Sequence, residues 1–69
     1  MKSASYLAGY EWAKKDFEVQ GYESTLDTYM NYMEDPIVEY YDHNTQEEIK
    51  GYCDGFAEIM MEIQKGNLN

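Results

Sequence analysis

Residues 45–64 read TQEEIKGYCDGFAEIMMEIQ, and this stretch decides the fold class. Its apolar side chains return every three or four residues, at Ile49, Tyr52, Cys53, Phe56, Met60 and Ile63. That is the period of a helix with one buried face. Thr45 and Glu48 have the spacing of a capping box, which closes the start of a helix. Gly66 marks its end, because glycine readily takes the left-handed conformation found there.

The same period appears near the N-terminus, where Tyr6, Tyr10, Ala13 and Phe17 lie on one helical face. Ser3 or Ser5 can cap this helix, and Gly21 can end it. The pattern predicts a helix over about residues 4–20.

The middle of the chain predicts a second helix that opens at Ser24, with Asp27 as the acidic half of a capping box. Its expected buried stripe consists of Leu26, Tyr29, Met30 and Met33. Pro36 interrupts the helix. We expect Asp35 to cap a short third helix with Pro36 at its first position, or residues 36–42 to form a brief extended stretch.

Two small-residue motifs echo each other, Gly9-Tyr10-x-x-Ala13 and Gly51-Tyr52-x-x-Gly55. Small residues four apart share a helix face and let another backbone approach closely. We expect the first helix to pack against the last at these positions; the alternative is a dimer interface that uses the same groove. The predicted fold is an all-α, small three- to four-helix bundle formed by one domain, residues 1–69.

The core is expected to be thin, because a chain of 69 residues buries only about 60% of its unfolded surface. Leu, Ile, Val and Phe number only 11, which together with a net charge of −9 is typical of disorder. Eight tyrosines, five methionines and one tryptophan supply apolar area instead and favour a folded chain. A homodimer would add stability and is plausible.

Charge excludes several function classes. The chain has 14 acidic residues, five lysines and no arginine, whereas nucleic-acid binding needs a basic surface. We therefore expect no direct binding to nucleic acid and none to anionic membranes. The N-terminus lacks the apolar core of an export signal, and Cys53 is the single cysteine, so no intrachain disulfide can form. These features fit a cytoplasmic protein.

No constellation for catalysis is apparent, so we do not expect an enzyme. His43 has neither a nucleophile motif nor a second histidine to act with, and a loop position before the last helix explains it. Cys53 and His43 are too few for a structural zinc site. The stretch from Asp42 fails as a calcium loop, because Glu47 and Cys53 replace its required glycine and glutamate. We expect no metal and no cofactor.

The acidic residues are distributed unevenly. Ten lie between Lys15 and Lys50 with no lysine or arginine among them. In the first helix, Glu11 and Lys15, and Lys14 and Glu18, are spaced to form compensating pairs. In the second helix, Glu23, Asp27 and Glu34 lie opposite the expected apolar stripe. Residues four apart on a helix are separated by about 6 Å, comparable with successive phosphates on a DNA strand.

In size, charge and helicity the whole chain resembles a class of small acidic phage-encoded inhibitors, which includes DNA mimics that block restriction, CRISPR or other nucleic-acid-handling host proteins. The resemblance implies a host protein with a basic surface as the partner, met in the host cytoplasm. The alternative is a general interaction module, antitoxin-like or an assembly factor, whose acidic face only confers solubility.

Tyrosines extend the candidate surface, because they are enriched in binding hot spots. Tyr10, Tyr29 and Tyr52 fit core stripes, whereas Tyr22, Tyr32, Tyr40 and Tyr41 are hard to bury together. We expect at least one of Tyr40 and Tyr41 to be exposed. The candidate binding residues are Glu23, Asp27, Tyr32, Glu34, Asp35, Glu39, Tyr40, Tyr41 and Asp42.

Overall fold

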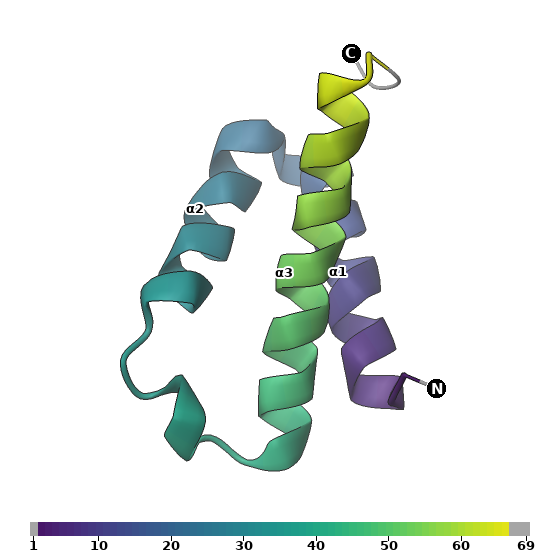
Figure 1. The fold of residues 1–69 in the computed structure, drawn as a ribbon. Coiled ribbons are helices and arrows are strands. Elements are labelled where there is room, and N and C mark those ends of the chain that lie inside the picture. The colour runs from purple at the N-terminus through teal and green to yellow at the C-terminus, as the bar shows by residue number, and fades with distance from the viewer. Residues whose placement is uncertain (1, 67–69) are drawn as a thin grey trace.

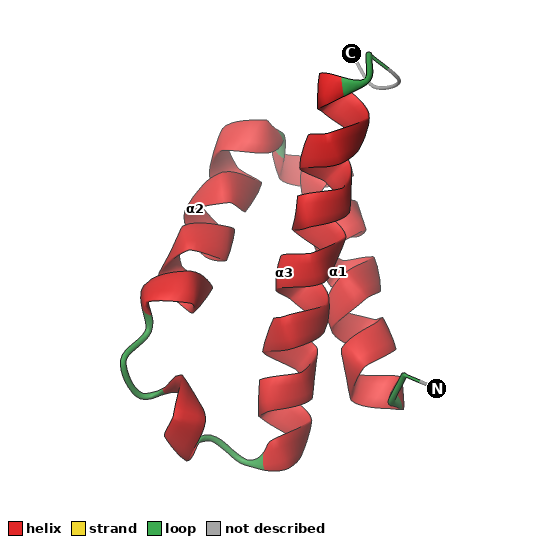
Figure 2. Ribbon diagram, viewed as in Figure 1, coloured by secondary structure: helices red, strands yellow, loops and turns green. Residues whose placement is uncertain are grey.

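The computed structural model describes residues 2–66, so Met1 and residues 67–69 of the predicted domain lie outside it. Within this range three α-helices run up, down and up: α1 (Ala4–Gln20), α2 (Tyr22–Glu34) and α3 (His43–Gln64) (Figure 1). A short 3-10 helix, η1 (Val38–Tyr40), lies between α2 and α3. The described residues contain no strand, as Figure 2 shows. The all-α prediction and the boundaries of the first helix are confirmed.

The closest helix pair is α1 and α3, which lie side by side and run in the same direction (Figure 1). A Cβ atom on Gly9 would lie 1.9 Å from the Glu48 carbonyl oxygen, and one on Gly51 would lie 1.9 Å from that of Tyr6. Only glycine permits so close a backbone approach. The predicted crossing is confirmed, and these glycines are used within the chain rather than against a second copy.

The core forms where α2 closes over this pair. Phe56 and Ala13 are completely buried, with Tyr52 and Ile59 beside them. The rings of Tyr22 and Tyr29 lie 5.5 and 5.1 Å from the Phe56 ring, measured between centroids. Aromatic pairs at this separation add stability beyond the area they bury.

The predicted apolar stripe of α2 is wrong for its two methionines. Met30 is 45% exposed and Met33 is 62% exposed. The side that faces the core instead carries Tyr22, Thr25, Tyr29 and Tyr32, which alternate at three- and four-residue spacing. Three tyrosine rings cover more of the core than two methionines would, and the fully buried Thr25 at their centre lets α2 approach closely.

Two predicted helix caps are also wrong, each by three residues. The helix α2 begins directly after Gly21, whose φ of 88° reverses the chain, and no side chain caps it. The Ser24–Asp27 capping box is therefore absent. At α3 the cap is Asp42, which accepts a hydrogen bond from the Thr45 backbone N–H. Thr45 donates its own hydroxyl to Asp42, so it cannot act as the cap.

The connector between α2 and α3 is a turn followed by η1, so the predicted short helix within residues 36–42 is confirmed, but it begins at Val38 rather than at Pro36. Asp35 accepts hydrogen bonds from the Ile37 N–H at 3.0 Å and from the Tyr41 hydroxyl at 2.7 Å. Asp35 thus holds the turn, and η1 starts only at Val38. The Gln46 side chain donates to the carbonyls of residues 39 and 41, which ties the connector to α3. Gly66, with a φ of 79°, follows the end of α3 as predicted.

Candidate functional site

An acidic face covers the outward side of α2 and continues onto η1. We define it by Glu23, Asp27, Glu34 and Glu39, whose residues are all exposed. At 100° per residue the three α2 carboxylates lie within about 40° of one another, opposite the buried Thr25. No lysine or arginine occurs between Lys15 and Lys50 to offset them in the sequence. The arrangement presents uncompensated negative charge to a partner.

Asp35 and Asp42 lie next to this face but hold the backbone as well. Hydrogen bonds from the Ile37 N–H and then from the Tyr41 hydroxyl lower the pKa of Asp35. The Thr45 side chain and nearby backbone N–H groups lower the pKa of Asp42. Both carboxylates therefore remain charged at neutral pH while they organise the connector.

The predicted tyrosine anchors separate into one exposed residue and two packed ones. Tyr40 is 78% exposed, which confirms that at least one of the adjacent pair faces solvent. Tyr41 is half-buried with its hydroxyl on Asp35. Tyr32 is also half-buried, edge-on to Tyr52 with centroids 5.3 Å apart. Tyr22 is 39% exposed while it packs on Phe56, so it contributes to core and surface alike.

Apolar side chains interrupt the acidic face at positions that the sequence did not indicate. Met30 lies about 20° from Glu23 on the helix circumference and between Asp27 and Glu34 along the helix axis. Met33 and Ile37 are exposed near the C-terminal end of α2. Their exposure depends on which stripe of α2 packs inward, so periodicity alone could not reveal it. Methionine is adaptable, and such surfaces suit partner binding.

Many of the carboxylates that connect one helix to another accept hydrogen bonds from tyrosine hydroxyls rather than from lysines. Tyr6 donates to Asp54, Tyr10 to Glu58 and Tyr52 to Asp16, each joining α1 to α3. The predicted pair of Lys14 with Glu18 is wrong, because Lys14 reaches Glu58 on α3 at 2.9 Å. With five lysines for 14 acids, tyrosine hydroxyls supply donors that the chain otherwise lacks.

The tyrosine–carboxylate hydrogen bonds between α1 and α3 predict that the free energy of unfolding falls at alkaline pH. The hydrogen bond to Asp54 and burial raise the pKa of Tyr6 to about 12, and burial and Asp16 raise the pKa of Tyr52. An unfolded tyrosine titrates near pH 10. The stabilisation is therefore fully present below about pH 10 and is lost as the pH rises toward 12. Urea unfolding followed by circular dichroism between pH 8 and 11.5 should show a falling midpoint.

Lysines also lose their protons over this pH range, so the fall in stability could have a second cause. Single variants show whether the tyrosine hydrogen bonds cause it. Tyr6→Phe should flatten the decline, whereas Tyr40→Phe should not change it, because Tyr40 is 78% exposed. An unchanged decline in Tyr6→Phe would assign it to general charge repulsion instead.

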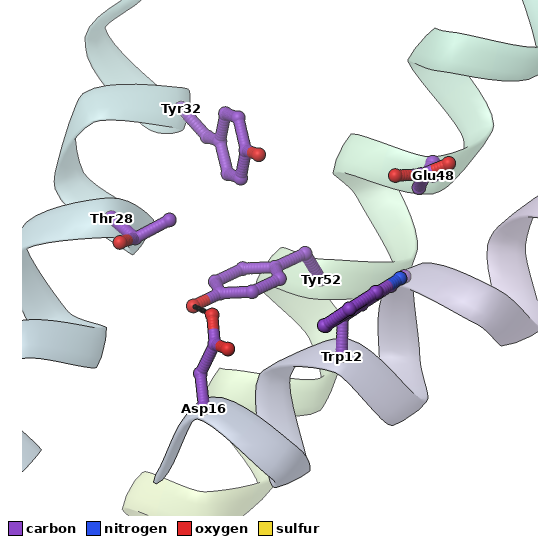
Figure 3. Close-up of a pocket in the computed structure, with 7 residues that line it drawn as sticks. Trp12, Asp16, Thr28, Tyr32, Glu48 and Tyr52 are labelled. Atoms are coloured by element: carbon purple, nitrogen blue, oxygen red, sulfur yellow. Dashed lines mark hydrogen bonds between the residues drawn. The ribbon is translucent and has the colours of Figure 1, made fainter. Parts of the chain in front are cut away.

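An open pocket of about 260 Å³ lies where the three helices meet (Figure 3). It is lined by Gly9, Trp12, Asp16, Thr28, Tyr32, Glu48 and Tyr52. Figure 3 shows Tyr32 and Trp12 on different sides of Tyr52, with the Tyr52 hydroxyl on Asp16 at 2.8 Å. Trp12 is 51% exposed. The sequence contains one indication of this exposure, because the single tryptophan lies off the apolar stripe of α1.

The remaining candidate residues are placed as follows. His43 is the exposed first residue of α3 rather than a loop residue. Cys53 is only partly buried, and burial followed by the negative charge of Asp54 raises the pKa of its thiol, which disfavours a reactive thiolate. Within residues 2–66, no three His, Cys, Asp or Glu side chains are arranged to hold a metal ion. No helix in that range has the length and apolar character needed to span a membrane.

Comparisons with known protein families, with curated proteins and with solved structures find no match to this chain.

Proposed function

We propose that this protein is an acidic inhibitor that binds a basic, nucleic-acid-handling host protein and occupies the groove meant for DNA or RNA. Restriction and CRISPR proteins are targets of this kind. The observation that carries the proposal is the acidic face of α2 and η1, exposed and without a nearby lysine in the sequence. In this role the protein would be phage-encoded and act in the host cytoplasm.

Electrostatics make a basic groove the natural complement of this surface. Uncompensated charges of one sign attract a surface of the opposite sign and accelerate association. They also repel DNA, RNA and other acidic proteins, which narrows the choice of partner. Carboxylates one helical turn apart have about the spacing of phosphates along a strand, so a groove that contacts phosphates can contact them.

A second candidate function is a general protein-interaction module, such as an antitoxin-like protein or an assembly factor. The exposed Met30, Met33 and Ile37 favour it, because a groove that reads only phosphates gains nothing from apolar contacts. In that case the carboxylates chiefly maintain solubility, and the apolar side chains determine the partner.

Capture from a bacterial lysate on the immobilised protein, followed by elution and mass spectrometry, separates the two. The inhibitor proposal expects a basic nucleic-acid-binding protein as the main species. Duplex DNA should release it at constant salt, and raised salt should release it because charges are screened within about 8 Å at physiological ionic strength. A main species that resists both DNA and salt would contradict the proposal and favour the interaction module.

A further inference from the structure

The pocket at the helix junction combines aromatic rings with carboxylates. Trp12 from α1, Tyr32 from α2 and Tyr52 from α3 supply the rings, and Asp16 and Glu48 supply the charges. Each ring comes from a different helix, so the tertiary fold creates the site. In Figure 3 the Glu48 carboxylate lies across the opening from Tyr32, with Trp12 and Tyr52 below them. No basic residue lines the pocket.

The volume limits what can enter. At about 260 Å³ the pocket falls below the roughly 300–1,000 Å³ of ordinary small-molecule sites. It is open to solvent and has room for the end of one long side chain. A substrate or cofactor of usual size would protrude into water and lose most of its contacts.

The electrostatics favour a cation. Aromatic faces carry negative potential and attract ammonium and guanidinium groups. Burial raises the pKa of the Tyr32 hydroxyl, and the charges of Glu48 and then Asp16 raise it further. The field that opposes a phenolate in the pocket also favours a positive group there.

The same ring already contacts a cation within the chain. The Lys15 ammonium lies 5.4 Å from the centre of the Trp12 ring. Lys15 lines a neighbouring hollow with Ala8, Glu11 and Trp12, rather than the pocket itself. Lys15 therefore does not line the pocket, which remains open to a cation from outside the chain.

We infer that this pocket receives the cationic end of an arginine or lysine side chain from the partner protein. The cation preference stands on the pocket alone, and the source of the cation rests on the proposed function, which supplies a basic partner. The site would act as a specific contact beside the acidic face. A partly desolvated charge–aromatic contact adds affinity at one position, whereas exposed carboxylates mainly speed association.

Trp12 provides the test, because it is the only tryptophan and its fluorescence reports on the pocket. We would titrate the protein with the amide of N-acetyl-arginine and with the neutral citrulline analogue, at constant ionic strength. The arginine compound should bind about tenfold more tightly, as expected for one partly desolvated cation–aromatic contact. Equal responses to the two compounds would overturn the inference.

Two charge-matched variants locate the site. Glu48→Gln removes a carboxylate from the pocket, and Glu18→Gln removes one from an exposed position of α1 that lies outside both the pocket and the acidic face. Glu48→Gln should weaken arginine binding several-fold, whereas Glu18→Gln should leave it unchanged, with circular dichroism confirming that both fold. Equal affinities in the two variants would overturn the inference.

Free tetramethylammonium tests the source of the cation. If it binds tenfold more tightly than the arginine compound, the pocket serves a small quaternary ammonium ligand and the inferred partner side chain is wrong. None of these titrations contains a nucleic-acid-binding protein. A negative titration therefore leaves the groove proposal standing, and a captured species that resists DNA leaves the cation preference standing.

Discussion

Replacing Gly51 with alanine is expected to unfold the protein. The new Cβ atom would lie 1.9 Å from the Tyr6 carbonyl oxygen and 3.0 Å from the Tyr10 nitrogen. Both neighbours are backbone, so no side chain can move aside, and α1 and α3 would have to separate. Overpacking usually costs about 1–3 kcal/mol and sometimes more. A domain of this size has only about 3–5 kcal/mol in reserve.

Thermal and urea unfolding followed by circular dichroism would measure the effect. Gly9→Ala meets Glu48 in the same way and should be equally severe. Gly55→Ala should be milder, because its Cβ would lie 2.8 Å from the Tyr10 carbonyl oxygen. Ala8→Leu adds a larger group at an exposed neighbouring position and should fold like the parent. Alanine favours helices over glycine by roughly 1 kcal/mol. A more stable Gly51→Ala would therefore disprove the close crossing.

The crossing was predictable because both motifs follow from spacing within one helix. Gly9 with Ala13, and Gly51 with Gly55, are each four residues apart, and that spacing places small residues on one face in any helix. No knowledge of the rest of the fold is needed. The glycines also carry a propensity cost that only a close contact offsets, so their presence inside helices was informative.

The helix starts were harder to place, because several capping residues compete within a few positions. Asp42 and Thr45 can both cap a helix, and the structure joins them in one hydrogen-bonded pair with Asp42 outermost. At α2 the chain uses the positive φ of Gly21 and needs no side-chain cap. Sequence pattern ranks such caps by residue type, whereas the outcome depends on the path of the incoming chain.

The inward face of α2 and the aromatic pocket could not be read from the sequence for a related reason. The predicted stripe of α2 consists of Leu26, Tyr29, Met30 and Met33, and Tyr22, Thr25, Tyr29 and Tyr32 form a second, overlapping stripe. The second stripe faces inward in the structure, where Phe56 of α3 packs between Tyr22 and Tyr29. Of the predicted stripe, Leu26 and Tyr29 also pack against the core, and the two methionines do not. The net charge of the α2 region was predictable, but a pocket built from three helices requires their relative positions.

A variant that neutralises the connector carries the largest expected effect on binding. It combines Glu34→Gln, Asp35→Asn, Glu39→Gln and Asp42→Asn. The fold should survive, because the oxygen of an asparagine can still accept from the Ile37 N–H at position 35 and from the Thr45 N–H at position 42. The amide NH2 takes the place of the second carboxylate oxygen and can donate to the hydroxyl of Tyr41 or of Thr45. Relief of repulsion among like charges adds stability. Circular dichroism should therefore match the parent.

Binding to the partner released by DNA should nevertheless fall sharply. Exposed charges act chiefly on encounter, so the association rate should drop by about tenfold or more at low salt, with a smaller change in dissociation. The dependence of affinity on salt should also become shallower, since fewer charges remain to be screened. Surface plasmon resonance at several salt concentrations separates these quantities.

The acidic-face proposal depends on where the carboxylates lie rather than on the total charge. Two double variants that remove the same number of carboxylates test this. Glu34→Gln with Glu39→Gln removes two exposed carboxylates from the α2–η1 region, and Glu11→Gln with Glu18→Gln removes two exposed carboxylates from α1. Both pairs make the net charge less negative by two. If the carboxylates only maintain solubility, the two pairs should have the same small effect on the association rate. The proposal predicts a clearly slower association for the first pair alone. If the two pairs associate at equal rates and DNA does not compete, the carboxylates do not mimic a nucleic acid, and the exposed methionines become the better account of the interface.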